Sequence, residues 1–210
     1  MASSPSSPQP SPAVEPLAAA AARTIALQML EERGRGAVLV GVARVDTALE
    51  HLLQAVMTPG PTKGDGLFLP DRPLGSLGAK AALASRLGLI DAPVAQALAV
   101  LRKLRNAFAH STESASLADP AHSARLAEVV TQARTNPLWT PLETVLAAQP
   151  PTPHGPRDPA LRDYILLITI LVAFLEAAAQ KLRPFQPPVV MALGVCGKTV
   201  RNAAFLPLAI

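Results

Sequence analysis

The sequence predicts an all-α protein, a compact bundle of about six helices joined by long loops rich in proline and glycine. Apolar residues recur every three or four positions between Glu15 and Leu182, which is the spacing of one helix face. The breaks fall at glycine or proline, and no segment alternates as a strand does. With 210 residues, half of them hydrophobic, the chain is long enough to bury one core.

Composition divides the chain into three parts. Residues 1–14 are a Ser/Pro-rich tail that we expect to be disordered, residues 15–183 are the expected helical domain, and residues 184–210 are an extension without a clear pattern. The tail lacks the basic and apolar regions of a secretory signal, and the single Cys196 excludes a disulfide within the chain. We therefore expect a cytoplasmic protein.

Two helices are expected before the first long loop. The segment Glu15–Arg33 is rich in strong helix formers and is followed by Gly34 and Gly36, which should end the helix. A second helix over 37–56 carries Asp46 and Glu50 beside an apolar stripe. The stripe consists of Val38, Val42, Val45, Leu49, Leu52 and Val56.

Two more helices follow a long loop over 59–75, which holds four prolines and four glycines and should pack on the helices. A third helix is expected from the N-cap candidate Ser76 to Gly88. A fourth begins at Asp91 and Pro93. Its apolar face consists of Val94, Ala97, Leu98, Leu101, Leu104 and Phe108.

In the last part of the domain, the sequence predicts a fifth helix over 121–134 and a short helix before the next loop. Thr140, Pro141 and Glu143 form a capping-box pattern at the start of that short helix. A final helix should run from Asp158 to about Leu182. Its unbroken apolar run is about half of the ~20 residues that span a bilayer, so we expect a buried central helix and no contact with a membrane.

The stretch LRKLRNAFAH contains the candidate functional residues Arg105, Asn106 and His110. Arg105 follows Leu101 by four residues, so we expect it on the apolar side of the helix, where a guanidinium needs a partner. Asp46 and Glu50 are the candidate acids.

Two interpretations of this trio remain open. Arg105 and His110 are about 140° apart on an ideal helix, so they converge only if the helix ends near His110. The pair then either handles a phosphodiester or closes the helix without chemistry. Arg102 and Lys103 are candidate phosphate contacts, although a solvated helix face explains them equally well.

No pattern predicts a metal or a cofactor. The other histidines are scattered singly, and no cluster has metal-ligand spacing. The stretch GVCGKT lacks the leading glycine of a phosphate-binding loop. With 3% aromatic residues the chain offers no platform for stacking nucleobases, and the net charge of +4 is too small to demand nucleic acid.

The block LFLPDRPLGSLGAKAALASRLGLIDAPVAQALAVLRKLRNAFAHS resembles the central signature of the mannitol operon repressor family. The shared features are a loop ending in PLGSL, a helix ending in LGLI and a helix closing on LRxxRNxFAH. The resemblance is specific over Gly66–His110 and extends loosely over 20–183. It implies a helical transcriptional regulator that represses a sugar-alcohol operon or a similar one, with a protein or nucleic acid as its partner.

The motif RNAFAH also resembles that of HEPN-domain proteins, which are helical bundles that often dimerise. In their active members an arginine and a histidine cut RNA without a metal. That resemblance implies a phosphate contact for Arg105, a general acid or base in His110 and a positioning role for Asn106. A metal-independent ribonuclease is therefore the alternative to a binding module, which would not be an enzyme.

We predict a homodimer, because low charge and high apolar content leave more hydrophobic surface than a helical monomer of this size covers. Light scattering at micromolar concentration should give twice the mass of one chain, 21.9 kDa. A monomer under these conditions would contradict the prediction.

Overall fold

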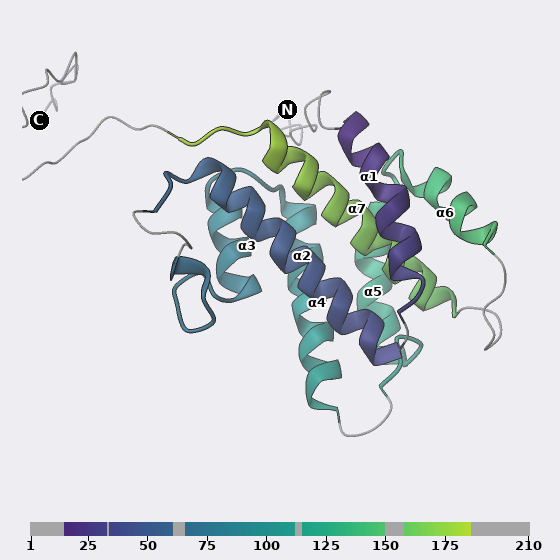
Figure 1. Ribbon diagram of the computed structural model, residues 1–210. Helices are drawn as coiled ribbons and strands as arrows, with labels where there is room; N and C mark the ends of the chain where they lie inside the picture. Colours follow the sequence, from purple (N-terminus) through teal and green to yellow (C-terminus); the bar gives the residue numbers. More distant parts are fainter. Residues whose placement is uncertain (1–14, 33, 61–65, 112–114, 150–157, 186–210) are drawn as a thin grey trace, which may run out of the picture.

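A computed structural model describes residues 15–32, 34–60, 66–111, 115–149 and 158–185 (Figure 1). This part of the chain contains seven α-helices, one 3-10 turn and no strand, so the all-α prediction is confirmed. The helices are α1 (Glu15–Met29), α2 (Gly34–Val56), α3 (Leu77–Arg86), α4 (Ala92–His110), α5 (Pro120–Ala133), α6 (Trp139–Ala147) and α7 (Pro159–Lys181), and the turn η1 is Gly66–Phe68. The expected tail lies outside the described residues, and so does the extension apart from Pro184 and Phe185.

Helix α7 is the centre of the bundle. Its apolar run is buried continuously from Tyr164 to Ala173, and the helix packs against α1, α2, α5 and α6. Helix α4 lies on the other side of α2 and also contacts α3 and α5 (Figure 1). No helix in the described part of the chain combines the length and the hydropathy that crossing a membrane requires.

Close packing of α2 on α7 depends on a glycine. A Cβ at Gly41 would lie 2.5 Å from the Tyr164 hydroxyl oxygen, so any larger residue would force the two helices apart. The Tyr164 hydroxyl donates a hydrogen bond to the Val38 carbonyl oxygen at 2.9 Å, and burial raises the pKa of this phenol. The contact joins the first and last parts of the domain.

The sequence predicted most helix boundaries correctly. The side chains of Ser76, Asp91 and Asp158 accept hydrogen bonds from the first turns of α3, α4 and α7. Gly88 has a φ of +67° and ends α3, as expected.

Two predicted boundaries are wrong. Helix α1 ends at Met29 rather than Arg33, because the chain turns at residues 30–32 and Gly34, with a φ of +47°, already begins α2. The expected capping box also does not form, because α6 begins one residue before Thr140. The side chain of Asn136 accepts from the N–H of Leu138 in the turn before α6.

Helix α6 carries the only tryptophan of the chain. Trp139 is buried where α6 packs on α1 and α7, and the Arg134 guanidinium lies 5.7 Å from the centre of its ring. A cation at this distance from an aromatic face is attracted by it.

Two buried side chains, one aromatic and one charged, hold the loop between α2 and α3. Phe68, in η1, is buried against the core, as the sequence predicted for this loop, whereas Leu67 and Leu69 are exposed. Lys80, in α3, is also buried, with 2% of its surface exposed, and its ammonium lies 5.9 Å from the centre of the Phe68 ring.

Two carboxylates of α2 bind the buried Lys80. Its Nζ donates to Asp46 Oδ2 at 2.9 Å and to Glu50 Oε2 at 2.8 Å. Burial of the ammonium alone would lower the pKa of Lys80, but the two hydrogen bonds and the attraction of the two carboxylates outweigh it and raise the pKa above 10.5. This ion triad fixes α3 and the preceding loop against α2.

Replacing Lys80 with methionine should destabilise the fold by about 3 kcal/mol at pH 7, because two neighbouring carboxylates lose their shared counter-charge. The value is at the low end for a broken buried pair, since the side chains of Asp46 and Glu50 are 32% and 29% exposed. Urea denaturation measures the change, with the exposed Lys103→Met as the control, which should stay within about 0.5 kcal/mol.

The difference in the free energy of unfolding between the wild type and Lys80→Met depends on pH through the raised pKa of Lys80. The stabilisation is complete below pH 10.5 and is lost as the pH rises through the higher pKa of the folded state. On the alkaline side, the wild type and Lys80→Met should therefore approach each other as the pH rises above 10.5. Equal losses for Lys80→Met and the control would contradict the role of the triad.

Candidate functional site

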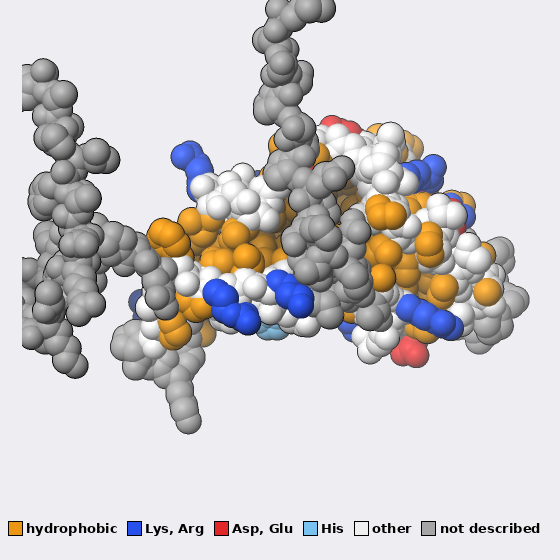
Figure 2. All heavy atoms as spheres, turned by 90° about the horizontal axis from the view of Figure 1, so that it is seen from above, with side chains coloured by type: hydrophobic (Ala, Val, Ile, Leu, Met, Phe, Trp, Pro, Cys, Tyr) orange, Lys and Arg blue, Asp and Glu red, His pale blue; other side chains and the backbone are white. Residues whose placement is uncertain are grey.

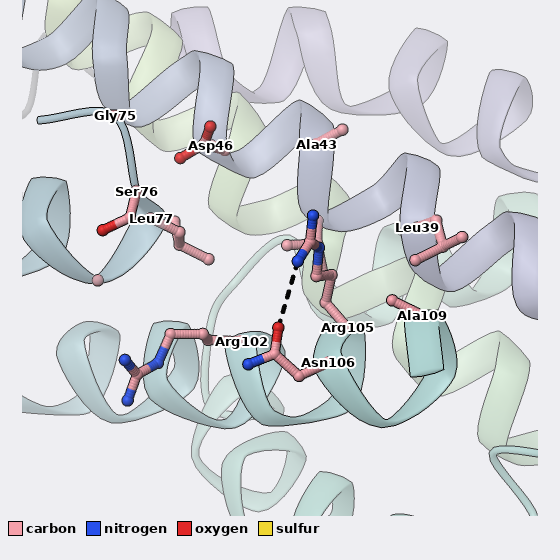
Figure 3. A pocket seen from close by; sticks show the side chains of 12 residues that line it. Leu39, Ala43, Asp46, Gly75, Ser76, Leu77, Arg102, Arg105, Asn106 and Ala109 are labelled. Carbon is pink, nitrogen blue, oxygen red and sulfur yellow. Dashed lines mark hydrogen bonds between the residues drawn. The ribbon is translucent and has the colours of Figure 1, made fainter. Parts of the chain in front are cut away.

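A groove of about 690 Å³ lies between α2, α4 and the start of α3 (Figure 3). Two helix faces form its long walls, and each has the spacing i, i+3, i+4, i+7 that places four residues on one side of a helix. The lining residues are Leu39, Val42, Ala43 and Asp46 of α2, Arg102, Arg105, Asn106 and Ala109 of α4, and residues 75–78 at one end.

The groove is polar at one end and apolar at the other. Asp46 lies near Ser76 at the end that α3 closes, whereas Leu39 lies near Ala109 at the opposite end (Figure 3). None of the described residues that line the groove is aromatic.

Arg105 lines the groove and is exposed, so the expectation that it points into the core is wrong. Its guanidinium extends from α4 toward α2, on the side of Ala43 (Figure 3). Its Nη1 donates to Asn106 Oδ1 at 3.3 Å. The expected pairing with Asp46 or Glu50 does not form, because Lys80 binds both carboxylates.

Arg102 lies against the first turn of α3, whereas Lys103 is outside the groove. A Cβ at Gly78 would lie 3.1 Å from Nη1 of Arg102, so the glycine allows this close approach. Arg102 has no acidic partner among the described residues. Of the two predicted phosphate contacts, the structure places only Arg102 at the groove.

The start of α3 presents free backbone donors to the groove. The Ser76 hydroxyl accepts from the N–H of Ala79 at 3.1 Å, and the Ser76 carbonyl accepts from the N–H of Lys80. The N–H groups of Leu77 and Gly78 have no acceptor within the described ranges. Free N–H groups and the positive end of the helix dipole make this turn attractive to anions.

His110 is the last residue of α4, where the sequence predicted the helix to end, and it is exposed. It does not line the groove that contains Arg105 and Asn106. Arg35, at the start of α2, holds this end of α4 by donating to the carbonyl oxygens of Ala109 at 2.9 Å and Ser111 at 3.2 Å. The candidate trio is therefore divided between the groove and the helix end.

Sequence reasoning missed Lys80, Gly78 and Arg35. Lys80 shares a buried face of α3 with Ala84, so a lysine at apolar spacing, together with two acids four residues apart, was a usable signal for the triad. No sequence signal indicated that Arg35 would reach a helix end more than 70 residues away.

Neither a metal centre nor a known relative explains the groove. Among the described residues, no group of three His, Cys, Asp or Glu side chains is placed to hold a metal ion. Comparison with protein families, with characterised proteins and with solved structures finds no match to this chain. The function therefore has to be inferred from the chemistry of the groove.

Arg105→Ala and His110→Ala should each change the free energy of unfolding by about 1 kcal/mol or less, because both side chains are exposed and neither compensates a buried charge. Thermal melts of the two variants measure this. A loss of several kcal/mol for Arg105→Ala would instead support a buried partner for its guanidinium.

Proposed function

We propose that this chain is a transcriptional regulator similar to mannitol operon repressors, and that its groove binds a ligand without catalysing a reaction. One observation carries the proposal: the groove contains Arg102, Arg105 and Asn106 but not His110. It therefore has groups that hold an anion and lacks the histidine that would move a proton.

The remaining titratable groups of the groove support binding over catalysis. A general acid or base must exchange a proton near neutral pH. Arginine stays protonated in proteins, and the Asp46 carboxylate is hydrogen-bonded to Lys80. Asn106 does not titrate. Among the described residues that line the groove, Asp46 is therefore the only ionisable side chain besides the two arginines, and its carboxylate is already bound by Lys80.

One face of the molecule supports regulation through a partner more than through an extended contact with nucleic acid. On the face seen in Figure 2, Lys and Arg side chains stand apart from one another, with hydrophobic side chains between them. A nucleic-acid surface gathers basic side chains along the path of the phosphates. Hydrophobic side chains at the surface support the proposed homodimer and contact with a partner protein.

A metal-independent ribonuclease is the second candidate, and one observation favours it. Arg105 and Asn106 are hydrogen-bonded to each other in the groove, and His110 is only one turn further along α4. Bringing His110 to Arg105 requires the last turn of α4 to unwind. Because Arg35 binds the carbonyl oxygens of that turn, unwinding would break two hydrogen bonds.

Replacing both Arg102 and Arg105 with glutamine in the cell should change the same transcripts as deleting the gene, whereas Lys103→Gln should leave them unchanged. Sequencing of cellular RNA measures the transcripts. The purified wild type should leave RNA intact in a metal-free cleavage assay. Cleavage that disappears in both Arg105→Ala and His110→Ala would replace the regulator with the ribonuclease.

A further inference from the structure

We propose that the groove binds the phosphate group of a small, non-aromatic phosphate monoester. The inference rests on the proposed function, in which this groove is a binding site, and it assigns the chemical class of the ligand. The phosphate lies at the end closed by α3, between Arg102, Arg105 and the first turn of that helix.

The two arginines of the groove favour an anion. Arg102 and Arg105 are three residues apart on one helix face, and neither has an acidic partner in the described part of the chain. Arg102 also lies against the positive end of the α3 dipole, where a cation is unfavourable and an anion is favourable. One phosphate between the two guanidinium groups and the helix start relieves both conflicts.

The donors at this end outnumber the needs of a single carboxylate and fit a tetrahedral anion. Arg105 extends toward α2 and Arg102 toward the start of α3 (Figure 3), and the N–H groups of Leu77 and Gly78 have no acceptor among the described residues. Because Asn106 Oδ1 accepts from Arg105, its amide nitrogen remains as a donor, and it points toward the side of Arg102 (Figure 3). These groups approach from two elements, as the oxygens of a phosphate require.

Asp46 selects phosphate over sulfate. Its Oδ1 is buried without a hydrogen-bond partner, although its side chain as a whole lines the groove. The second pKa of a phosphate group is about 6, so near neutral pH part of the population keeps a P–OH group that can donate a hydrogen bond to the Asp46 carboxylate. Sulfate has no such proton, and the carboxylate repels it.

The volume and lining of the rest of the groove restrict the part of the ligand beyond its phosphate group. Its volume of about 690 Å³ is within the range of small-molecule sites and larger than a phosphate alone requires. The far end, at Leu39 and Ala109, is apolar and suits a short carbon chain. Because none of the described lining residues is aromatic, they offer a nucleobase no stacking partner.

Titration calorimetry on the full chain tests the proposal with glycerol 3-phosphate, adenosine 5′-monophosphate, inorganic phosphate and sulfate. We expect saturable binding of glycerol 3-phosphate, no tighter binding of the nucleotide, and weaker binding of sulfate than of inorganic phosphate. Arg102→Gln and Arg105→Gln should each weaken binding about tenfold or more. Lys103→Gln, which removes the same charge from the same helix outside the groove, should leave the affinity unchanged.

A fourth variant tests the role of Asp46. Asp46→Asn should reduce the preference for inorganic phosphate over sulfate, because an amide can donate to either anion, and a thermal melt checks that the fold survives. The proposal would be overturned by an unchanged preference, by equal losses in all three cation variants, by tighter binding of the nucleotide, or by no binding of any phosphate compound.

The two proposals fail separately. Phosphate binding that depends on Arg102 and Arg105, with transcripts unchanged in the double variant, would support the ligand class and remove the regulatory role. Altered transcripts without phosphate binding would support the regulatory role and remove the proposed ligand class.

Discussion

The position of α3 depends on one buried cation. Lys80 reaches from α3 to Asp46 and Glu50 on α2, and with Phe68 it closes the space beneath the loop. A buried ammonium is tolerated only where its charge is compensated and its hydrogen bonds are made. This requirement aligns α3 with α2 and so places the first turn of α3 at the end of the groove.

Small residues then keep the groove open. Ala43 stands opposite Arg105, and Gly78 lets Arg102 approach the backbone of α3. Larger side chains at these positions would fill the space between α2 and α4 or displace the guanidinium group. The groove is thus the space left where the facing sides of α2 and α4 carry several small or polar residues.

The fold was predictable because it depends on local sequence patterns. The site was not, because it depends on which of two cations the acids of α2 bind. Apolar spacing, the N-cap side chains of Ser76, Asp91 and Asp158, and Gly88 each act within a few residues. The pattern also identified Arg105, Asn106 and the acids of α2. It did not decide which cation those acids bind, because Lys80 and Arg105 both lie beside apolar faces and only the packing of α3 on α2 distinguishes them.

Burial of Trp139 in α6 has a consequence for spectroscopy. As the only tryptophan, it dominates the intrinsic fluorescence, and it sits where α6 packs on α1 and α7. The groove is formed by α2, α3 and α4 instead. Tryptophan emission therefore follows the unfolding of the α6 side of the bundle, and a constant emission on adding a ligand says nothing about whether the groove is occupied.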